Sequence, residues 1–127
     1  MNKETIKKLL SDSFIISEHN DIIVANNKFF CPNNDEDYPI GIKEKDGKII
    51  LSDMGRTYSR LIDIDIDLED EDLMGYVEKT EQAFYVTFDR ESHEFFVLCE
   101  KSNITLAFTN LLQAIILISN IHLQFEE

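Results

Sequence analysis

Apolar residues recur at helical spacing in four parts of the chain. In residues 3–14 they lie three and four positions apart, with lysines off that stripe. Shorter stretches of the same kind span residues 56–62 and 70–83, and a long one runs from Ile104 to about His122. Because one face of an α-helix repeats every 3.6 residues, this spacing predicts an N-terminal, two middle and one long C-terminal helix.

Strand-like runs separate these helices. Residues 21–26 form an apolar, β-branched run, whereas residues 40–51 and 84–100 each read as two strands around a turn. The first turn is Asp46-Gly47, and both residues tolerate the positive φ that a tight hairpin turn requires. Hairpins grouped with helices, without parallel crossovers, predict an α+β fold in which the helices pack against an antiparallel sheet. The chain of 127 residues fits a single domain.

The last predicted helix is apolar almost all round. A helix of this kind is either buried in the core or shared with a second copy of the chain. Its most apolar stretch, residues 111–119, is far shorter than the roughly 20 residues of a membrane span, so we expect no membrane insertion. Ser102 or Asn103 can cap the start of the helix. The residues expected in the core or in a homodimer contact are Leu111, Ile115, Leu117 and Ile118.

Residues 61–72, LIDIDIDLEDED, alternate apolar residues with aspartates and then become purely acidic. In one interpretation the stretch is extended, and it turns its isoleucines and Leu68 to the core and its aspartates to water. In the other, residues 67–72 begin the next helix, where carboxylates meet the positive end of the helix dipole. Both can hold along the stretch. The seven acids between residues 63 and 72 are Asp63, Asp65, Asp67, Glu69, Asp70, Glu71 and Asp72.

The negative charge of the chain is unevenly distributed. Its 25 acidic and 12 basic residues give a net charge of −13. Residues 1–60 hold 10 acids and 9 bases, whereas residues 61–127 hold 15 acids and 3 bases, a net of −12. Direct binding to nucleic acid needs a basic surface, so the composition argues against it. The acidic second half instead favours basic protein partners.

A strand-to-helix turn is predicted at residues 51–55, LSDMG. The side chain of Ser52 or Asp53 can cap the helix that follows. Gly55 can adopt a backbone conformation that is closed to larger residues. The alternative role for Asp53 is that of a catalytic or metal-binding carboxylate.

The stretch of residues 47–61, GKIILSDMGRTYSRL, resembles an uncharacterised domain family of bacteria and phages. The marker of that family is a hairpin strand ending in Leu-Thr-Asp-Asp-Gly, followed by a short helix that ends in leucine. Here Ser52 and Met54 replace the threonine and the second aspartate. The resemblance extends over about residues 20–122, and includes the final hairpin and apolar helix. It implies a fold type and a bacterial or phage setting, and it brings no activity with it.

The residue pattern contains no complete catalytic signature. A metal-dependent nuclease needs clustered carboxylates, usually with a lysine on a strand. The turn already explains Asp46, and the acid-x-lysine strand pattern is absent. The histidines are scattered, and no nucleophile elbow is present. The nuclease candidates are Asp37, Glu44, Asp46, Lys48 and Asp53, and the histidines are His19, His93 and His122.

Metal and cofactor sites are not expected either. A calcium loop that starts at Asp63 would need glycine and glutamate where Leu68 and Met74 stand. No phosphate loop or dinucleotide fingerprint occurs. Cys31 and Cys99 form no Cys-x-x-Cys pair, so we expect two buried thiols in a reducing cytoplasm. No apolar leader is expected near the start of the chain, where charged residues interrupt the sequence.

The uneven charge leads to a functional hypothesis. Aspartates two apart on a strand would lie about 6.6 to 6.8 Å apart, about twice the roughly 3.4 Å rise per phosphate on one nucleic-acid strand. We therefore expect a non-enzymatic acidic protein of the bacterial cytoplasm that mimics nucleic acid. Its partner would be the basic surface of a nucleic-acid-binding protein or defence nuclease complex, as for phage inhibitors of the anti-CRISPR type. The alternative from another class is a host or phage homodimeric interaction module.

Overall fold

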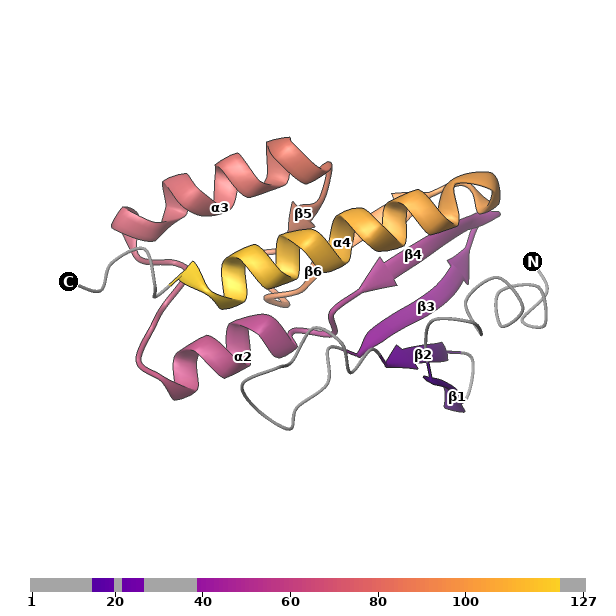
Figure 1. Cartoon of the computed structure of the whole chain (residues 1–127), viewed down its shortest axis with the longest axis horizontal. Coiled ribbons are helices and arrows are strands. Elements are labelled where there is room, and N and C mark those ends of the chain that lie inside the picture. Colours follow the sequence, from indigo (N-terminus) through magenta and orange to yellow (C-terminus); the bar gives the residue numbers. More distant parts are fainter. Residues whose placement is uncertain (1–14, 20–21, 27–38, 122–127) are drawn as a thin grey trace.

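The computed structural model describes residues 15–19, 22–26 and 39–121. Within them, six antiparallel strands form one sheet in the order β1-β2-β3-β4-β6-β5 (Figure 1). The predicted α+β class, with an antiparallel sheet built from hairpins, is confirmed. The strands are β1 (Ile15–His19), β2 (Ile22–Asn26), β3 (Ile40–Lys45), β4 (Lys48–Ser52), β5 (Thr87–Phe88) and β6 (Phe95–Cys99). The helices are α2 (Arg56–Asp63), α3 (Glu71–Phe84) and α4 (Ile104–Ser119), with a short 3-10 helix η2 (Lys101–Asn103) before α4.

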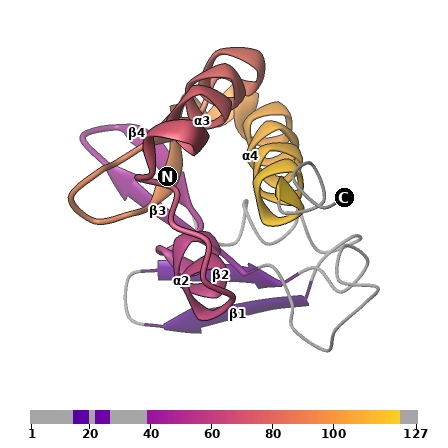
Figure 2. The same cartoon turned by 90° about the vertical axis from the view of Figure 1, so that its left-hand side faces the viewer.

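Helix α4 packs on the sheet and contacts both other long helices of the described part of the molecule. It crosses β4 and β6, and α3 and α2 pack along its two sides (Figures 1 and 2). The buried face of α4 shares one hydrophobic core with the inward residues of the sheet, among them Ile42, Leu51 and Phe95. The buried residues of α4 are Ile104, Ala107, Phe108, Leu111, Leu112, Ala114, Ile115 and Ile118.

This packing bears on the two predictions for the last helix. Leu111, Ile115 and Ile118 are at most 1% exposed, so these three side chains lie in the core of the chain, and the homodimer contact stays a prediction. Leu117 is different, because 47% of its surface is exposed. Asn103 occupies the N-cap position as predicted, but its side chain makes no capping hydrogen bond.

The segment Lys101–Ser119 is long and apolar enough to cross a membrane by length and composition alone, with a mean hydropathy of 1.4. A core helix has the same two properties. Here the burial of one face of α4 against the sheet accounts for its apolar composition.

The two predicted hairpins form with different lengths. The first has the expected turn, with φ of +52° at Asp46 and +79° at Gly47. The second, predicted over residues 84–100, has a first strand of only two residues, Thr87–Phe88. Phe84 packs against the core as the last residue of α3, and the left-handed φ of +57° at Tyr85 ends that helix. Because Phe84 packs against the core from the end of α3, the helix ends one residue later than predicted and the strand begins later.

The start of the sheet is only partly anticipated by the sequence. The strand predicted over residues 21–26 is β2, and it pairs with β1, which the pattern does not predict. The predicted helix at residues 3–14, as well as Cys31 and His122, lies outside the described residues. Cys99 is a free, half-buried thiol, and burial, followed by the charge of Glu100, raises its pKa.

The extended interpretation of residues 61–68 is wrong. Helix α2 continues to Asp63, and the chain then turns, with the backbone N–H groups of Ile64 and Ile66 both donating to the carbonyl of Leu61 at 3.1 and 2.8 Å. Ile64 is therefore 53% exposed and Ile62 is 41% exposed, although Leu68 is fully buried. The alternating isoleucines and aspartates lie at the end of α2 and in the turn after it, and not on a strand. The alternation therefore does not place the two kinds of side chain on opposite faces.

Candidate functional site

The acidic segment, which we define as the seven carboxylates from Asp63 to Asp72, joins the end of α2 to the start of α3. All seven side chains are exposed. Two apolar residues fasten this part of the backbone to the molecule, since Leu68 is buried in the core and Ile66 packs against it. The fold thus keeps mutually repelling charges on an anchored stretch of chain. The members are Asp63, Asp65, Asp67, Glu69, Asp70, Glu71 and Asp72.

Local hydrogen bonds explain the later acids of the segment. Oδ1 of Asp67 accepts a 2.9 Å hydrogen bond from the N–H of Glu69. Asp70 is the N-cap of α3, and its Oδ1 accepts a 2.9 Å hydrogen bond from the N–H of Asp72. Glu71 and Asp72 lie in the first helical turn, where the helix dipole favours negative charge. The prediction that residues 67–72 begin the next helix is therefore confirmed for Asp70, Glu71 and Asp72, whereas Asp67 and Glu69 lie in the turn before α3.

An aromatic pair ties the acidic segment to the turn between β5 and β6. The rings of Tyr58 and His93 stack with centroids 3.8 Å apart and planes within 6°. The Tyr58 hydroxyl donates to Oδ1 of Asp67 at 3.2 Å, and Nε2 of His93 lies 3.1 Å from Oε1 of Glu69. Partial burial, followed by the hydrogen bond with Asp67, raises the pKa of Tyr58. The sequence offers no signal for this pair, because residues far apart along the chain meet only through tertiary packing.

Asp63 and Asp65 differ from the other members of the acidic segment. Within the described residues, neither side chain accepts a hydrogen bond, and no lysine or arginine forms an ion pair with any of the seven acids. The neighbouring Ile62 and Ile64 are exposed. This end of the segment therefore presents carboxylates and apolar side chains together at the surface.

Asp53 occupies a second unusual position, at the end of β4. Its side chain is buried, with 2% exposure. Oδ1 accepts hydrogen bonds of 2.9 Å from the N–H groups of Gly55 and Phe95, and Oδ2 accepts one of 3.3 Å from the N–H of Thr57. Burial raises the pKa of this carboxyl group, and the hydrogen bonds oppose that change. The N-cap residue of α2 is Gly55, whose φ of +77° confirms its special conformation. Asp53 lies two positions before the N-cap and reaches the first turn of α2 only through its hydrogen bond with the N–H of Thr57.

Ser52 completes this turn. Its Oγ accepts a 2.9 Å hydrogen bond from the N–H of Met54 and donates one of 3.1 Å to Oε2 of Glu94. The side chains of Ser52 and Asp53 thus join β4 and the start of α2 to the beginning of β6.

The geometry gives Asp53 a structural role. Both of its oxygens face backbone N–H groups, and no three His, Cys, Asp or Glu side chains of the described residues are grouped so that they could hold a metal ion. Of the nuclease candidates, Glu44, Asp46 and Lys48 lie at the turn between β3 and β4, and Asp53 follows the other end of β4. Asp37 lies outside the described residues.

These elements define a small α+β protein in which an apolar C-terminal helix crosses an antiparallel sheet and a buried aspartate fixes the strand-to-helix turn. The chain belongs to the family described as Domain of unknown function DUF1828, which matches residues 29–118. The match includes the turn at residues 51–55 and nearly all of α4, and it agrees with the resemblance to an uncharacterised family. Neither the curated proteins nor the solved structures include a match to this chain.

Proposed function

We propose that this protein is a non-enzymatic interaction protein whose acidic segment binds a basic surface of a partner protein. The observation that carries the proposal is the exposure of all seven carboxylates on a stretch of backbone that Leu68 anchors in the core. Because the charges are already in place, little conformational entropy is lost when a partner binds them.

The end of the acidic segment at Asp63 and Asp65 is the best candidate for the centre of the contact. Asp67, Asp70, Glu71 and Asp72 each support a turn or the start of α3. The carboxylates of Asp63 and Asp65 accept no hydrogen bond within the described residues, although Asp65 has a left-handed φ of +64° in the turn after α2. Ile62 and Ile64 beside them are exposed. A partner surface that combines lysines or arginines with apolar side chains would complement these four residues.

The partner we propose is the nucleic-acid-binding surface of a bacterial defence nuclease complex, which a phage inhibitor of the anti-CRISPR type would occupy. The small size of the chain and the net charge of −12 in residues 61–127 support this form of the proposal. The regular spacing of aspartates along a strand no longer supports it, since the acids lie on a helix end, a turn and a helix start. Competition for a basic groove would then depend on charge density and not on a copy of the phosphate spacing.

The test is a variant that neutralises the acidic segment with isosteric amides. Asn at positions 63, 65, 67, 70 and 72 and Gln at positions 69 and 71 preserve size. Asn also keeps the N-cap function of Asp70 and tolerates the left-handed φ of +64° at Asp65. The wild-type protein, immobilised, should capture a nucleic-acid-binding protein from a lysate of a bacterium that carries a CRISPR nuclease, and release it at high salt. It should also prevent that protein from shifting DNA in a gel.

A matched control separates local charge from total charge. It neutralises seven acids elsewhere and so has the same net charge as the first variant. We expect the control to keep the partner and the segment variant to lose it while remaining folded by circular dichroism. Equal capture by both variants, or capture that does not weaken with salt, would overturn the proposal. The control acids are Asp35, Glu36, Asp37, Glu78, Glu91, Glu126 and Glu127.

A further inference from the structure

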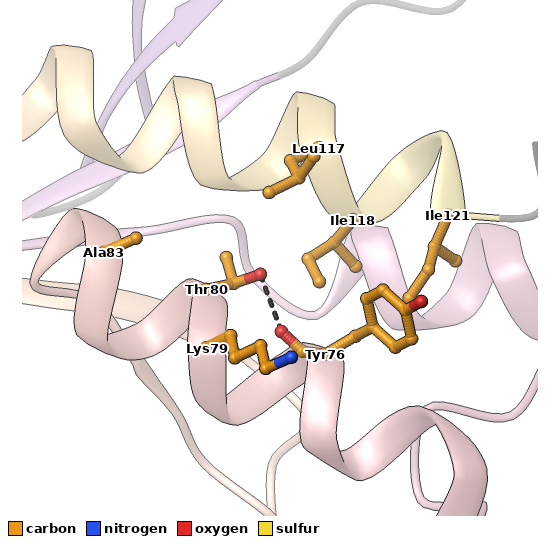
Figure 3. A pocket seen from close by; sticks show the side chains of 7 residues that line it. All are labelled: Tyr76, Lys79, Thr80, Ala83, Leu117, Ile118 and Ile121. Carbon is orange, nitrogen blue, oxygen red and sulfur yellow. Dashed lines mark hydrogen bonds between the residues drawn. The ribbon is translucent and has the colours of Figure 1, made fainter. Parts of the chain in front are cut away.

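A groove of about 260 Å³ lies between α3 and α4 (Figure 3). The base of the groove is formed by the apolar side chains of Ile118 and Ile121, which are 1% and 2% exposed. Leu117, which is 47% exposed, forms part of the wall on the side of α4. From α3 the groove is lined by Tyr76, Lys79, Thr80 and Ala83.

One charged side chain, that of Lys79, lines the groove. The hydroxyl of Thr80 donates a 2.8 Å hydrogen bond to the carbonyl of Tyr76, so the helix already uses its proton. Lys79 carries the charge, and its Nζ lies 5.9 Å from the centre of the Tyr76 ring. The residues one helical turn away from Lys79, at positions 75, 76, 82 and 83, are Gly, Tyr, Gln and Ala, so none offers a carboxylate.

This arrangement is unusual for the second half of the chain. Residues 61–127 contain 15 acids and 3 bases, yet the lining of the groove contains a lysine and no acid. Among the described residues, Arg90 has Glu81 at 3.9 Å, whereas no ion pair to a carboxylate is formed by Lys79. The ammonium group beside an apolar base is therefore complementary to an anion that carries an apolar body.

We propose that the groove binds a small amphipathic carboxylate, whose alkyl or aryl body lies against Ile118 and Ile121 and whose carboxylate pairs with Lys79. The lining spans about two turns of α3, roughly 11 Å. Its volume is near the lower end of ligand pockets, which typically measure about 300 to 1,000 Å³. These dimensions suit a medium-chain monocarboxylate better than a helix of a protein partner, which would need a longer apolar surface. The site is separate from the acidic segment and does not depend on the proposed function.

Octanoate is the probe for this site. In methyl-labelled protein, it should shift the signals of Leu117, Ile118 and Ile121 in a saturable titration. In the series from butyrate to octanoate, affinity should rise about fourfold for each added methylene group. Octanol, which has the same chain without the charge, should bind about tenfold more weakly, because it lacks the charge-assisted contact with Lys79.

Three variants assign the binding to the groove. Lys79→Met keeps an unbranched side chain without the charge and should remove the preference for octanoate over octanol. Ala83→Trp places a large side chain at an exposed position of the lining and should abolish binding. Lys101→Met removes an exposed lysine that does not line the groove and should leave the titration unchanged. Thermal unfolding checks that each variant is folded.

Three results would overturn the proposal. The first is that millimolar octanoate leaves the three methyl signals in place in the wild-type protein. The second is that octanoate and octanol bind equally. The third is that Lys101→Met changes the preference as much as Lys79→Met does. The latter results would show that no carboxylate is recognised at Lys79.

Discussion

The backbone N–H of Phe95 donates a 2.9 Å hydrogen bond to Oδ1 of Asp53, a residue 42 positions earlier in the chain. The N–H of Asp53 in turn donates a 3.0 Å hydrogen bond to the carbonyl of Phe95. Since the same carboxylate accepts a hydrogen bond from the N–H of Thr57, one side chain joins the end of β4, the start of β6 and the first turn of α2. The turn that resembles a family marker is thus a junction of three elements.

Replacing Asp53 with Asn should destabilise the protein by about 2 kcal/mol. The amide has only one acceptor oxygen, and its NH₂ group would face a backbone N–H, so a buried donor loses its partner. Urea unfolding at neutral pH measures the effect. The control is Asp46→Asn in the exposed hairpin turn, where Asn tolerates the φ of +52° and the change should stay within about 0.5 kcal/mol. Equal stability of both variants would contradict the junction role of Asp53.

The pH dependence of stability should have opposite signs at Asp53 and Asp89. Burial raises the pKa of Asp53 above its usual 3.8, so its contribution is complete below pH 3.8 and is lost as pH rises through the folded-state pKa. Hydrogen bonds from the N–H groups of Glu91 and Ser92 lower the pKa of Asp89 from 3.8, so its contribution is present above that pH and is lost as pH falls through the folded-state pKa.

Unfolding of Asp53→Asn and Asp89→Asn over the acid range, each compared with the wild type, separates these two effects. The stability advantage of the wild type over Asp53→Asn should shrink as pH rises above about 3.8, the value from which the pKa of Asp53 is raised. Its advantage over Asp89→Asn should shrink as pH falls below that value. Differences that change in the same direction would show that burial does not dominate at Asp53.

Two glycine substitutions should change stability in opposite directions. Gly55 has a φ of +77°, and an added Cβ would meet only ordinary contacts with the carbonyls of Ser92 and His93, at 3.5 and 3.9 Å. The cost of Gly55→Ala is then the left-handed backbone, about 1 to 2 kcal/mol. Gly75 lies within α3 with nothing within 4 Å of an added Cβ, so Gly75→Ala should stabilise by about 1 kcal/mol. Thermal unfolding of both variants checks the signs.

Charged substitutions in α4 distinguish its two faces. Ile115 is 1% exposed, so Ile115→Asp should cost more than about 3 kcal/mol, because a packed side chain is lost and a charge is buried. Leu117 is 47% exposed, and Leu117→Asp should change the free energy of unfolding by about 0.5 kcal/mol. Light scattering measures the oligomeric state independently of stability. A wild-type dimer that Leu117→Asp dissociates would show that the remaining exposed face of α4 is shared between copies.

The sequence predicts the parts of this protein that local rules control. The Asp46-Gly47 turn, the special conformation at Gly55 and the start of α3 at Asp70 all follow from backbone preferences and capping, which act between residues close in the chain. The apolar composition of residues 104–119 likewise predicts a helix that must be covered. The seven acids of the candidate site are visible as a cluster in the sequence alone.

Only the tertiary structure decides what these elements face. The period-two pattern of residues 62–68 satisfies the rule for a strand, yet α2 and the turn after it place Ile62 and Ile64 at the surface, because no neighbouring strand pairs with them. Packing against the sheet assigns Ile115 and Ile118 to the core and leaves Leu117 beside a groove. The stacking of Tyr58 on His93 and the hydrogen bond from Phe95 to Asp53 join residues far apart in the chain. Such contacts depend on the relative positions of whole elements, which nearest-neighbour preferences do not encode.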